Sequence, residues 1–109
     1  MLPKENRLTK KNDFDLVFKK GKNEKRDFLV VKTLKNNLKE SRFGFIVSKK
    51  VSSKAVVRNK VKRRLRDALQ KEVDNIKEAK DIIFIALPGI EKKEYSDIKE
   101  AVSSFFNKK

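Results

Sequence analysis

The sequence contains no cysteine and no histidine, and these two absences exclude several classes of function. Without cysteine there is no disulfide framework and no thiolate nucleophile. Without histidine the chain lacks the commonest general acid-base group and the commonest metal-binding side chain. Zinc sites and catalysis by Ser-His or Cys-His pairs are therefore excluded.

Long apolar runs are missing as well. The longest run, about seven residues within 81–87, is far shorter than the ~20 residues that a transmembrane helix needs. The N-terminal segment MLPKENRLTKK lacks the apolar core of a signal peptide. We therefore expect no membrane-spanning segment and a cytoplasmic location.

Acidic residues are scarce relative to basic ones. The chain has 15 Asp and Glu against 30 Lys and Arg, for a formal net charge of +15. Such an excess destabilises the compact state by self-repulsion and becomes useful when a polyanion, such as nucleic acid or an anionic membrane surface, supplies the opposite charge. Leu, Ile, Val and Phe make up 34 of the 109 residues, above the ~20% below which disorder is expected. The composition predicts a single folded domain over residues 1–109 with a basic surface.

The hydrophobic pattern predicts the order helix, strand, strand, helix, strand, helix. Thr9 is a candidate N-cap for the first helix, in which Phe14, Val17 and Phe18 share one face, and Gly21 ends it. The other predicted elements are strands at 27–34 and 42–50, a helix at 55–76, a strand at 81–87 and a helix at 95–106. The first two strands carry apolar residues on both faces and are expected to form a hairpin, whereas the continuous apolar run at 81–87 predicts a central, doubly covered strand.

The segment RNKVKRRLRD, at 58–67, concentrates positive charge on the second predicted helix. Its apolar positions form one stripe that is expected to pack on the sheet: Val61, Leu65, Ala68, Leu69 and Val73. Like charges at helical spacing each cost a few tenths of a kcal/mol, so the repulsion totals about one or two kcal/mol. A solvated face usually mixes both signs of charge, and a membrane-surface helix usually carries aromatic residues. Arg offers a fork of donors that matches phosphate, and Asn59 can bind a base or ribose, so nucleic acid is the favoured partner.

These residues resemble a known family. RNKVKRRLRD is similar to the Arg-Asn-Arg helix signature of the bacterial ribonuclease P protein subunit. RLTKKNDFDLVFKKG resembles that family's N-terminal helix, RFGFIVSKKV its second strand, DIIFIAL its third and YSDIKEAVSSFF its last helix. The resemblance covers nearly the whole chain, with the segments in the same order.

The resemblance implies an α+β fold, a single αββαβα domain in which helices pack on a small central sheet with a left-handed βαβ crossover. It implies an accessory protein of a ribozyme, monomeric within a complex of one protein and one catalytic RNA. That RNA frees the mature 5′ end of tRNA from its precursor, using Mg²⁺ bound mainly by the RNA. The protein would hold the catalytic RNA and the 5′ leader of precursor tRNA, with no catalytic residue, metal site or covalently bound cofactor of its own.

Two RNA-binding sites follow. On the basic helix, the expected contacts with the catalytic RNA are Arg58, Asn59, Lys60, Lys62, Arg63 and Arg66. Between the first helix and the sheet, the expected leader-binding cleft contains Phe14, Phe18, Val30, Lys32, Ile46, Ser48 and Lys49. Aromatic rings stack on unpaired bases and lysine attracts the backbone, a combination suited to single-stranded RNA. The alternative for Phe14 and Phe18 is an ordinary place in the core.

The sequence departs from the family pattern at a few positions. Lys60 and Asp67 stand where the family has Arg and Glu, Lys32 replaces an aromatic residue of the leader site, and Leu87 replaces a basic residue. A stand-alone RNA-binding module, associated with ribosomes or translation, is the main alternative and would need the basic helix but not the cleft. A protein-only nuclease would need clustered carboxylates, whereas the acidic residues here are scattered.

Overall fold

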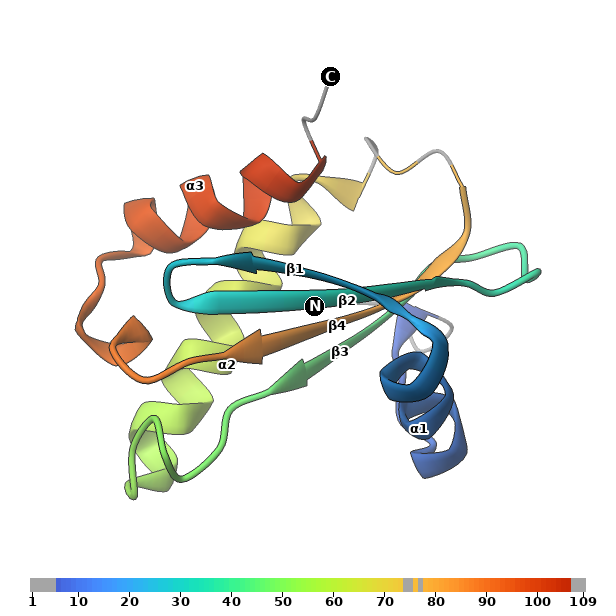
Figure 1. Cartoon of the computed structure of the whole chain (residues 1–109). Coiled ribbons are helices and arrows are strands. Elements are labelled where there is room, and N and C mark those ends of the chain that lie inside the picture. The colour runs from blue at the N-terminus through green and yellow to red at the C-terminus, as the bar shows by residue number, and fades with distance from the viewer. Residues whose placement is uncertain (1–5, 74–75, 77, 107–109) are drawn as a thin grey trace.

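A mixed sheet forms the centre of the computed structural model, which describes residues 6–73, 76 and 78–106. Within these residues one helix, α1, covers one face of the four-stranded sheet, while α2 and α3 cover the other (Figure 1). The elements are α1 Lys11–Lys20, β1 Lys22–Arg26, β2 Leu29–Lys35, β3 Arg42–Ile46, α2 Ala55–Gln70, β4 Lys80–Ala86, the short 3-10 helix η3 Ile90–Lys92 and α3 Tyr95–Phe106.

The strand order is β1-β2-β4-β3, which corrects one prediction. β2 and β3 do not form a hairpin, because β4 lies between them, antiparallel to β2 and parallel to β3. β4 takes this place because it is the most apolar strand and both of its faces are buried. The hairpin partner of β2 is instead β1, a strand of sequence KNEKR that the hydrophobic pattern did not predict. Its charged side chains suit the edge of a sheet, where they discourage pairing with other chains.

The rest of the predicted topology is confirmed. The chain crosses from β3 to the parallel neighbour β4 through α2, which passes behind the sheet in Figure 1. In Figure 1 both strands point to the left, β4 lies above β3 and α2 lies behind them. This combination makes the crossover left-handed, against the usual right-handed rule. Over the described residues, no helix is long and apolar enough to cross a membrane.

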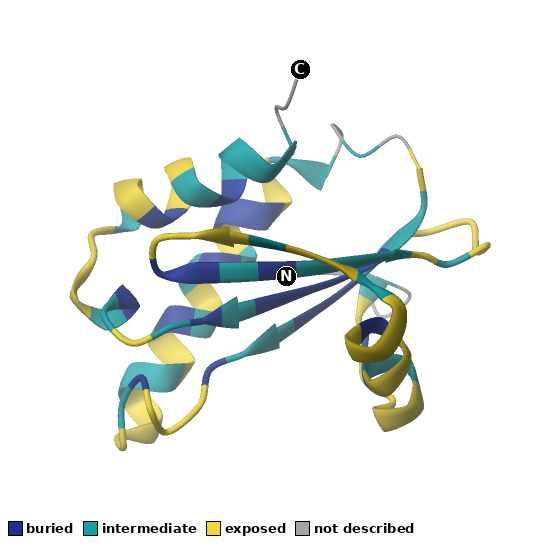
Figure 2. Ribbon diagram, in the orientation of Figure 1, coloured by how far each residue is buried: buried dark blue, intermediate teal, exposed yellow. Residues whose placement is uncertain are grey.

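The main core lies between the sheet and the helices α2 and α3. The predicted stripe of α2 is buried at Val61, Leu65, Ala68 and Leu69, although the helix ends at Gln70 and not at 76. Alternate residues of β4, Ile82 and Phe84, face this layer. Figure 2 shows the same division, with buried residues along the inner strands and exposed ones on the outer sides of the helices.

The helix α1 packs on the opposite face through a smaller core of Leu8, Val17 and Ile83. Thr9 is not its N-cap: Lys10 holds that position and makes no side-chain capping bond. The helix begins later because the Leu8 N–H donates to the Phe43 carbonyl at 2.8 Å, which keeps the preceding segment extended along β3. Gly21 does end the helix, as predicted. A Cβ there would lie 2.5 Å from the Val17 carbonyl oxygen, so no larger residue fits.

Candidate nucleic-acid interface

The buried stripe of α2 divides the basic side chains of that helix between two flanks. Lys62 and Arg66 lie on the flank beside β3, and Arg66 places its guanidinium carbon 5.9 Å from the centroid of the Phe45 ring. Lys60 and Arg63 lie on the other flank, beside α3. Four of the six predicted residues of α2 therefore lie on two separate basic flanks and not on one surface.

Arg58 and Asn59 stand at the N-terminal end of α2. The Arg58 Nη1 donates hydrogen bonds to the carbonyl oxygens of Ser52 and Ser53, both at 3.0 Å, so this half-buried side chain holds the turn that precedes the helix. Asn59 is exposed. Arg58 was predicted only as an RNA contact, and these two hydrogen bonds give it a local structural role as well.

The flank beside α3 includes residues that were not among the predicted contacts. A hollow of about 520 Å³ lies between the two helices, lined by Lys60, Arg63, Arg64, Asp67, Gln70, Lys71 and Tyr95. The Lys71 Nζ lies 5.6 Å from the centroid of the Tyr95 ring, and the Arg64 Nη1 donates to the Lys93 carbonyl at 3.1 Å. Arg64 is visible in the basic run of the sequence, but the nearness of Tyr95 depends on the packing of α3.

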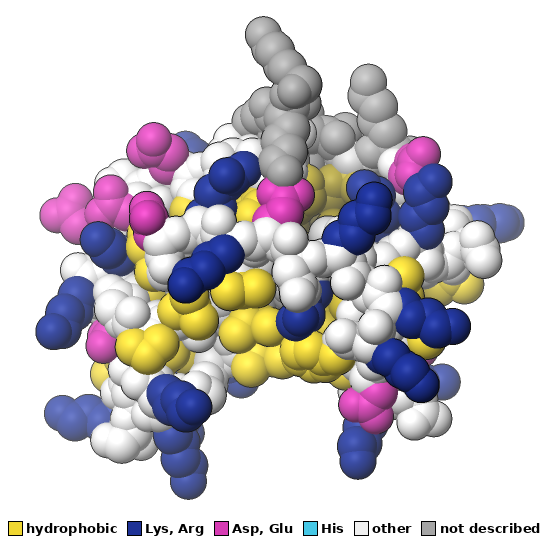
Figure 3. Space-filling model, in the orientation of Figure 1, with side chains coloured by type: hydrophobic (Ala, Val, Ile, Leu, Met, Phe, Trp, Pro, Cys, Tyr) yellow, Lys and Arg dark blue, Asp and Glu magenta, His cyan; other side chains and the backbone are white. Residues whose placement is uncertain are grey.

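The second predicted site lies on the α1 side of the sheet. Val30, Ile85 and Ile46 are direct neighbours across β2, β4 and β3, and each is half-buried. We call these three residues the apolar strip. Figure 3 shows hydrophobic side chains gathered in a band over this face, with lysine and arginine side chains around it. Ile85 was not selected from the sequence because the order of the strands was needed to place it.

Phe14 and Phe18, both on α1, have different environments. Phe14 is half-buried and packs against Gly44, where a Cβ would lie 2.5 Å from its ring. Phe18 is 42% exposed, so it is not an ordinary core residue. The Lys32 Nζ lies 5.3 Å from the Phe18 ring centroid and donates to the Asn23 Oδ1 at 2.6 Å. Asn23 belongs to the unpredicted strand β1, so no pattern in the sequence placed it beside Lys32.

Ser48 and Lys49 follow β3 and are both exposed. Ser48 lies two residues beyond Ile46, and its hydroxyl oxygen accepts a hydrogen bond from the Lys50 N–H at 3.3 Å. These residues therefore extend the apolar strip with polar and basic groups, in the connection that leads to α2.

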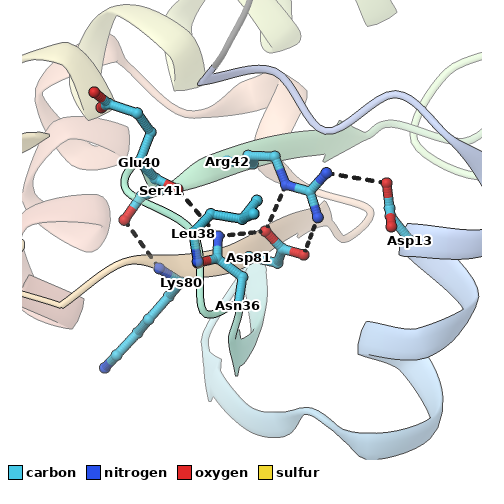
Figure 4. Close-up of polar contacts among 8 residues, drawn as sticks. All are labelled: Asp13, Asn36, Leu38, Glu40, Ser41, Arg42, Lys80 and Asp81. Atoms are coloured by element: carbon cyan, nitrogen blue, oxygen red, sulfur yellow. Dashed lines mark hydrogen bonds and ion pairs between the residues drawn. The ribbon is translucent and has the colours of Figure 1, made fainter.

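A polar network fixes the start of α1 to the sheet (Figure 4). Arg42 donates to both carboxylate oxygens of the buried Asp81, at 2.9 and 2.6 Å, and to Asp13 of α1 at 3.1 Å. Asn36 donates to the same Asp81 at 2.8 Å. The hydrogen bond to Asp81 raises the pKa of Arg42 above its ordinary value. The network thereby positions α1, and with it Phe14 and Phe18, over the sheet.

The carboxylates do not gather into a metal site. Among residues 6–73, 76 and 78–106, no group of three or more Asp or Glu side chains lies close enough to hold a metal ion. The most buried acid, Asp81, is engaged by Arg42 and Asn36. The described residues therefore offer no cluster that could hold a metal ion through protein ligands alone.

The chain is similar to known proteins over nearly its whole length. The chain matches the family described as Ribonuclease P over residues 2–109. It is 37% identical to the ribonuclease P protein component of Alkaliphilus metalliredigens, covering 94% of this chain and 92% of the relative. The RNase P protein of Staphylococcus aureus superposes with a TM-score of 0.84 at 35% identity, covering 94% of this chain and 98% of the other. That of Thermotoga maritima, solved in complex with 1-(4-fluorophenyl)-2-thiourea, gives 0.85 at 30% identity over 94% and 99%.

Proposed function

The chain belongs to the ribonuclease P protein family, and from this premise we propose that it binds the catalytic RNA of ribonuclease P together with the 5′ leader of precursor tRNA. A ribonuclease P protein component is the accessory subunit of an endoribonuclease holoenzyme, and it has an RNA partner. The proposal assigns the basic surfaces of α2 to the catalytic RNA and the apolar strip with Phe18 to the leader. It places one protein with one RNA in the cytoplasm.

One observation carries the assignment of the leader. Phe18 exposes 42% of its surface on a highly charged protein, and a lysine ammonium lies beside its ring. Exposed aromatic rings next to positive charge are how proteins bind unpaired nucleotides, because each base can stack while the backbone is attracted electrostatically. A stand-alone module that bound only folded RNA would have no use for this arrangement.

The proposal leaves bond cleavage to the RNA subunit. The chain has no histidine or cysteine, and its described carboxylates form no cluster that could activate water with a metal. Mg²⁺, when bound by the RNA, would supply the activated nucleophile and stabilise the charge that develops during cleavage. The residues of this chain bind and orient the two RNA molecules.

Reconstitution tests the proposal. The purified protein is added to the catalytic RNA of the same organism at a Mg²⁺ concentration too low for the RNA to work alone, and 5′ processing of a precursor tRNA is measured. We expect processing to be restored, and we expect protein without RNA to cleave nothing. Binding of the RNA without restored processing would favour a stand-alone RNA-binding module, and cleavage by protein alone would overturn the assignment of chemistry to the RNA.

A further inference from the structure

A groove of about 310 Å³ lies along the free edge of β3, and its lining includes Phe14 from one predicted site and Lys62 and Arg66 from the other. The strand β3 is the last strand of the sheet, with α1 on one side and α2 on the other (Figure 1). The groove is lined by Arg7, Leu8, Thr9, Phe14, Phe43, Phe45, Lys62 and Arg66. Its volume is at the lower end of the ~300 to 1,000 Å³ typical of small-molecule pockets, which suits one nucleotide and not a double helix.

The main chain of β3 offers hydrogen-bonding groups to this groove. Successive residues of a strand direct their N–H and C=O groups to alternate sides. The Phe43 carbonyl accepts from the Leu8 N–H at 2.8 Å, on the side away from β4. The N–H and C=O of Phe45, two residues further on, therefore point to the same side. These two groups of Phe45 could form hydrogen bonds with the edge of a base that carries both a donor and an acceptor.

The groove also has planar and cationic groups. The Phe45 ring stacks on Phe84 with centroids 5.5 Å apart, and the Arg66 guanidinium lies over the ring. Phe14 lines the opposite wall. Bases stack on aromatic rings and on guanidinium planes, and Arg and Lys attract phosphate. With Lys62 and Arg7 added, this one groove has the groups to hold a base and its phosphate.

We propose that the groove holds a single unpaired nucleotide of the catalytic RNA, an inference that rests on the proposed function. The position of the positive charge indicates that this nucleotide belongs to the catalytic RNA and not to the tRNA leader. Lys62 and Arg66 extend from α2, the helix assigned to the catalytic RNA, whereas the apolar strip assigned to the leader lies on the α1 side of the sheet. The groove thus continues the surface of α2 around the edge of the sheet.

Two matched substitutions test the stacking role. Arg66→Lys keeps the charge but removes the guanidinium plane. Arg26→Lys makes the same change at an arginine that also lies over a ring, that of Phe105, but at the opposite edge of the sheet. We expect Arg66→Lys to lower the affinity for the catalytic RNA by about fivefold to 150-fold, the range for a lost stacking contact, with the salt dependence unchanged. Arg26→Lys should change it less than twofold. Equal effects of the two substitutions, in proteins with unchanged thermal midpoints, would overturn the proposal.

Cross-linking identifies which RNA occupies the groove, independently of the Arg66→Lys variant. Because the chain has no cysteine, Thr9→Cys introduces a unique thiol at an exposed residue of the groove, and Ser96→Cys on α3 gives an exposed control. Each thiol is labelled with an aryl azide, and the holoenzyme is irradiated with precursor tRNA bound. We expect position 9 to cross-link to one unpaired stretch of the catalytic RNA, and position 96 not to reach that stretch.

The outcomes separate this proposal from the proposed function. Cross-links from position 9 to the tRNA leader, to paired RNA only, or to nothing in an assembled holoenzyme would overturn the groove proposal and leave the proposed function intact. Failure of the unmodified protein to bind the catalytic RNA would overturn the proposed function itself.

Discussion

The pair Phe18 and Lys32 shows how one departure from the family pattern changes the chemistry of the surface around it. Where the resemblance leads us to expect a second aromatic ring, Lys32 places its ammonium 5.3 Å from the Phe18 ring and 2.6 Å from the Asn23 Oδ1. An exposed cation–π contact contributes about 0.5 to 1 kcal/mol, enough to bias the ring toward one orientation. The site gains positive charge and loses one stacking surface.

Phe18→Ala should reduce the affinity of the holoenzyme for precursor tRNA while leaving mature tRNA binding nearly unchanged. Only the precursor has a leader, and a lost base-stacking contact costs about 1 to 3 kcal/mol, or roughly fivefold to 150-fold in affinity. Equilibrium binding of both tRNAs to wild-type and variant holoenzymes measures this difference. Equal losses for the two tRNAs would show that Phe18 does not bind the leader.

The neighbouring residue Val17 provides the control for folding. Val17 is fully buried, so Val17→Ala should lower the free energy of unfolding by about 1.5 to 3 kcal/mol. Phe18→Ala, at an exposed position, should change it much less. Urea denaturation of both variants separates lost binding from lost structure.

Among the elements, α2 combines core and surface roles in sixteen residues. Its buried stripe packs beside α3, so the cations lie on the two flanks that remain. Under the proposed function, bound RNA would supply the negative charge that offsets their mutual repulsion. The repulsion between these cations, which destabilises the helix in the free protein, would therefore be relieved by the binding that the helix is proposed to perform.

Arg58→Ala and Arg63→Ala should both weaken binding to the catalytic RNA. Each lost phosphate contact lowers the slope of log affinity against log salt concentration by roughly 0.7 to 0.9. The two should differ in stability, because Arg58 also bonds the carbonyls of Ser52 and Ser53: its removal should cost about 1 to 3 kcal/mol, whereas loss of the exposed Arg63 should cost less than about 0.5. Salt titrations and urea denaturation measure both effects. An unchanged slope in both variants would place the RNA site elsewhere.

The attachment of α1 depends on Arg42. Arg42→Met keeps the apolar stem but leaves the buried Asp81 without its cationic partner, which should lower the free energy of unfolding by about 3 to 5 kcal/mol. Asp13→Asn, at the more exposed end of the network, should cost less than about 1 kcal/mol. Urea denaturation compares the two. Similar small losses in both would mean that the network does not hold α1.

The pH dependence of this link follows from the raised pKa of Arg42. A cation with a raised pKa stabilises the fold at every pH below its ordinary value, and the stabilisation is lost only as pH rises through the higher folded value. That window lies in strong alkali. Titration of Arg42 itself therefore does not weaken the attachment of α1 at the pH of RNA-processing assays.

For the whole molecule, local patterns predicted the elements better than their arrangement. The apolar stripe of α2 and the central position of β4 follow from periodicity and from a continuous apolar run. The strand β1 was missed because its sequence, KNEKR, has no apolar alternation, and it forms by pairing with β2. The hairpin prediction was wrong because nearness in sequence favoured β2 with β3, whereas β4, far along the chain, inserts between them.

The candidate sites were likewise predictable from local sequence only where a single element forms them. The basic helix was evident from the sequence, but its division into two flanks depends on what α3 and β3 cover. Asn23 and Ile85 lie beside Lys32 and Val30 only because the strands pair in this order. The groove at the edge of β3 combines residues from three distant segments, so no local pattern marks it.

The central claim is that this protein adds recognition of the leader to a catalytic RNA, and the ratio of the dissociation constants of mature and precursor tRNA tests it most directly. The ratio is measured at one salt concentration, first with the catalytic RNA alone and then with the holoenzyme. A single stacked base would contribute about 1 to 3 kcal/mol, so we predict that the protein raises the ratio at least fivefold. The same ratio with and without the protein, in a holoenzyme shown to be assembled, would contradict the account.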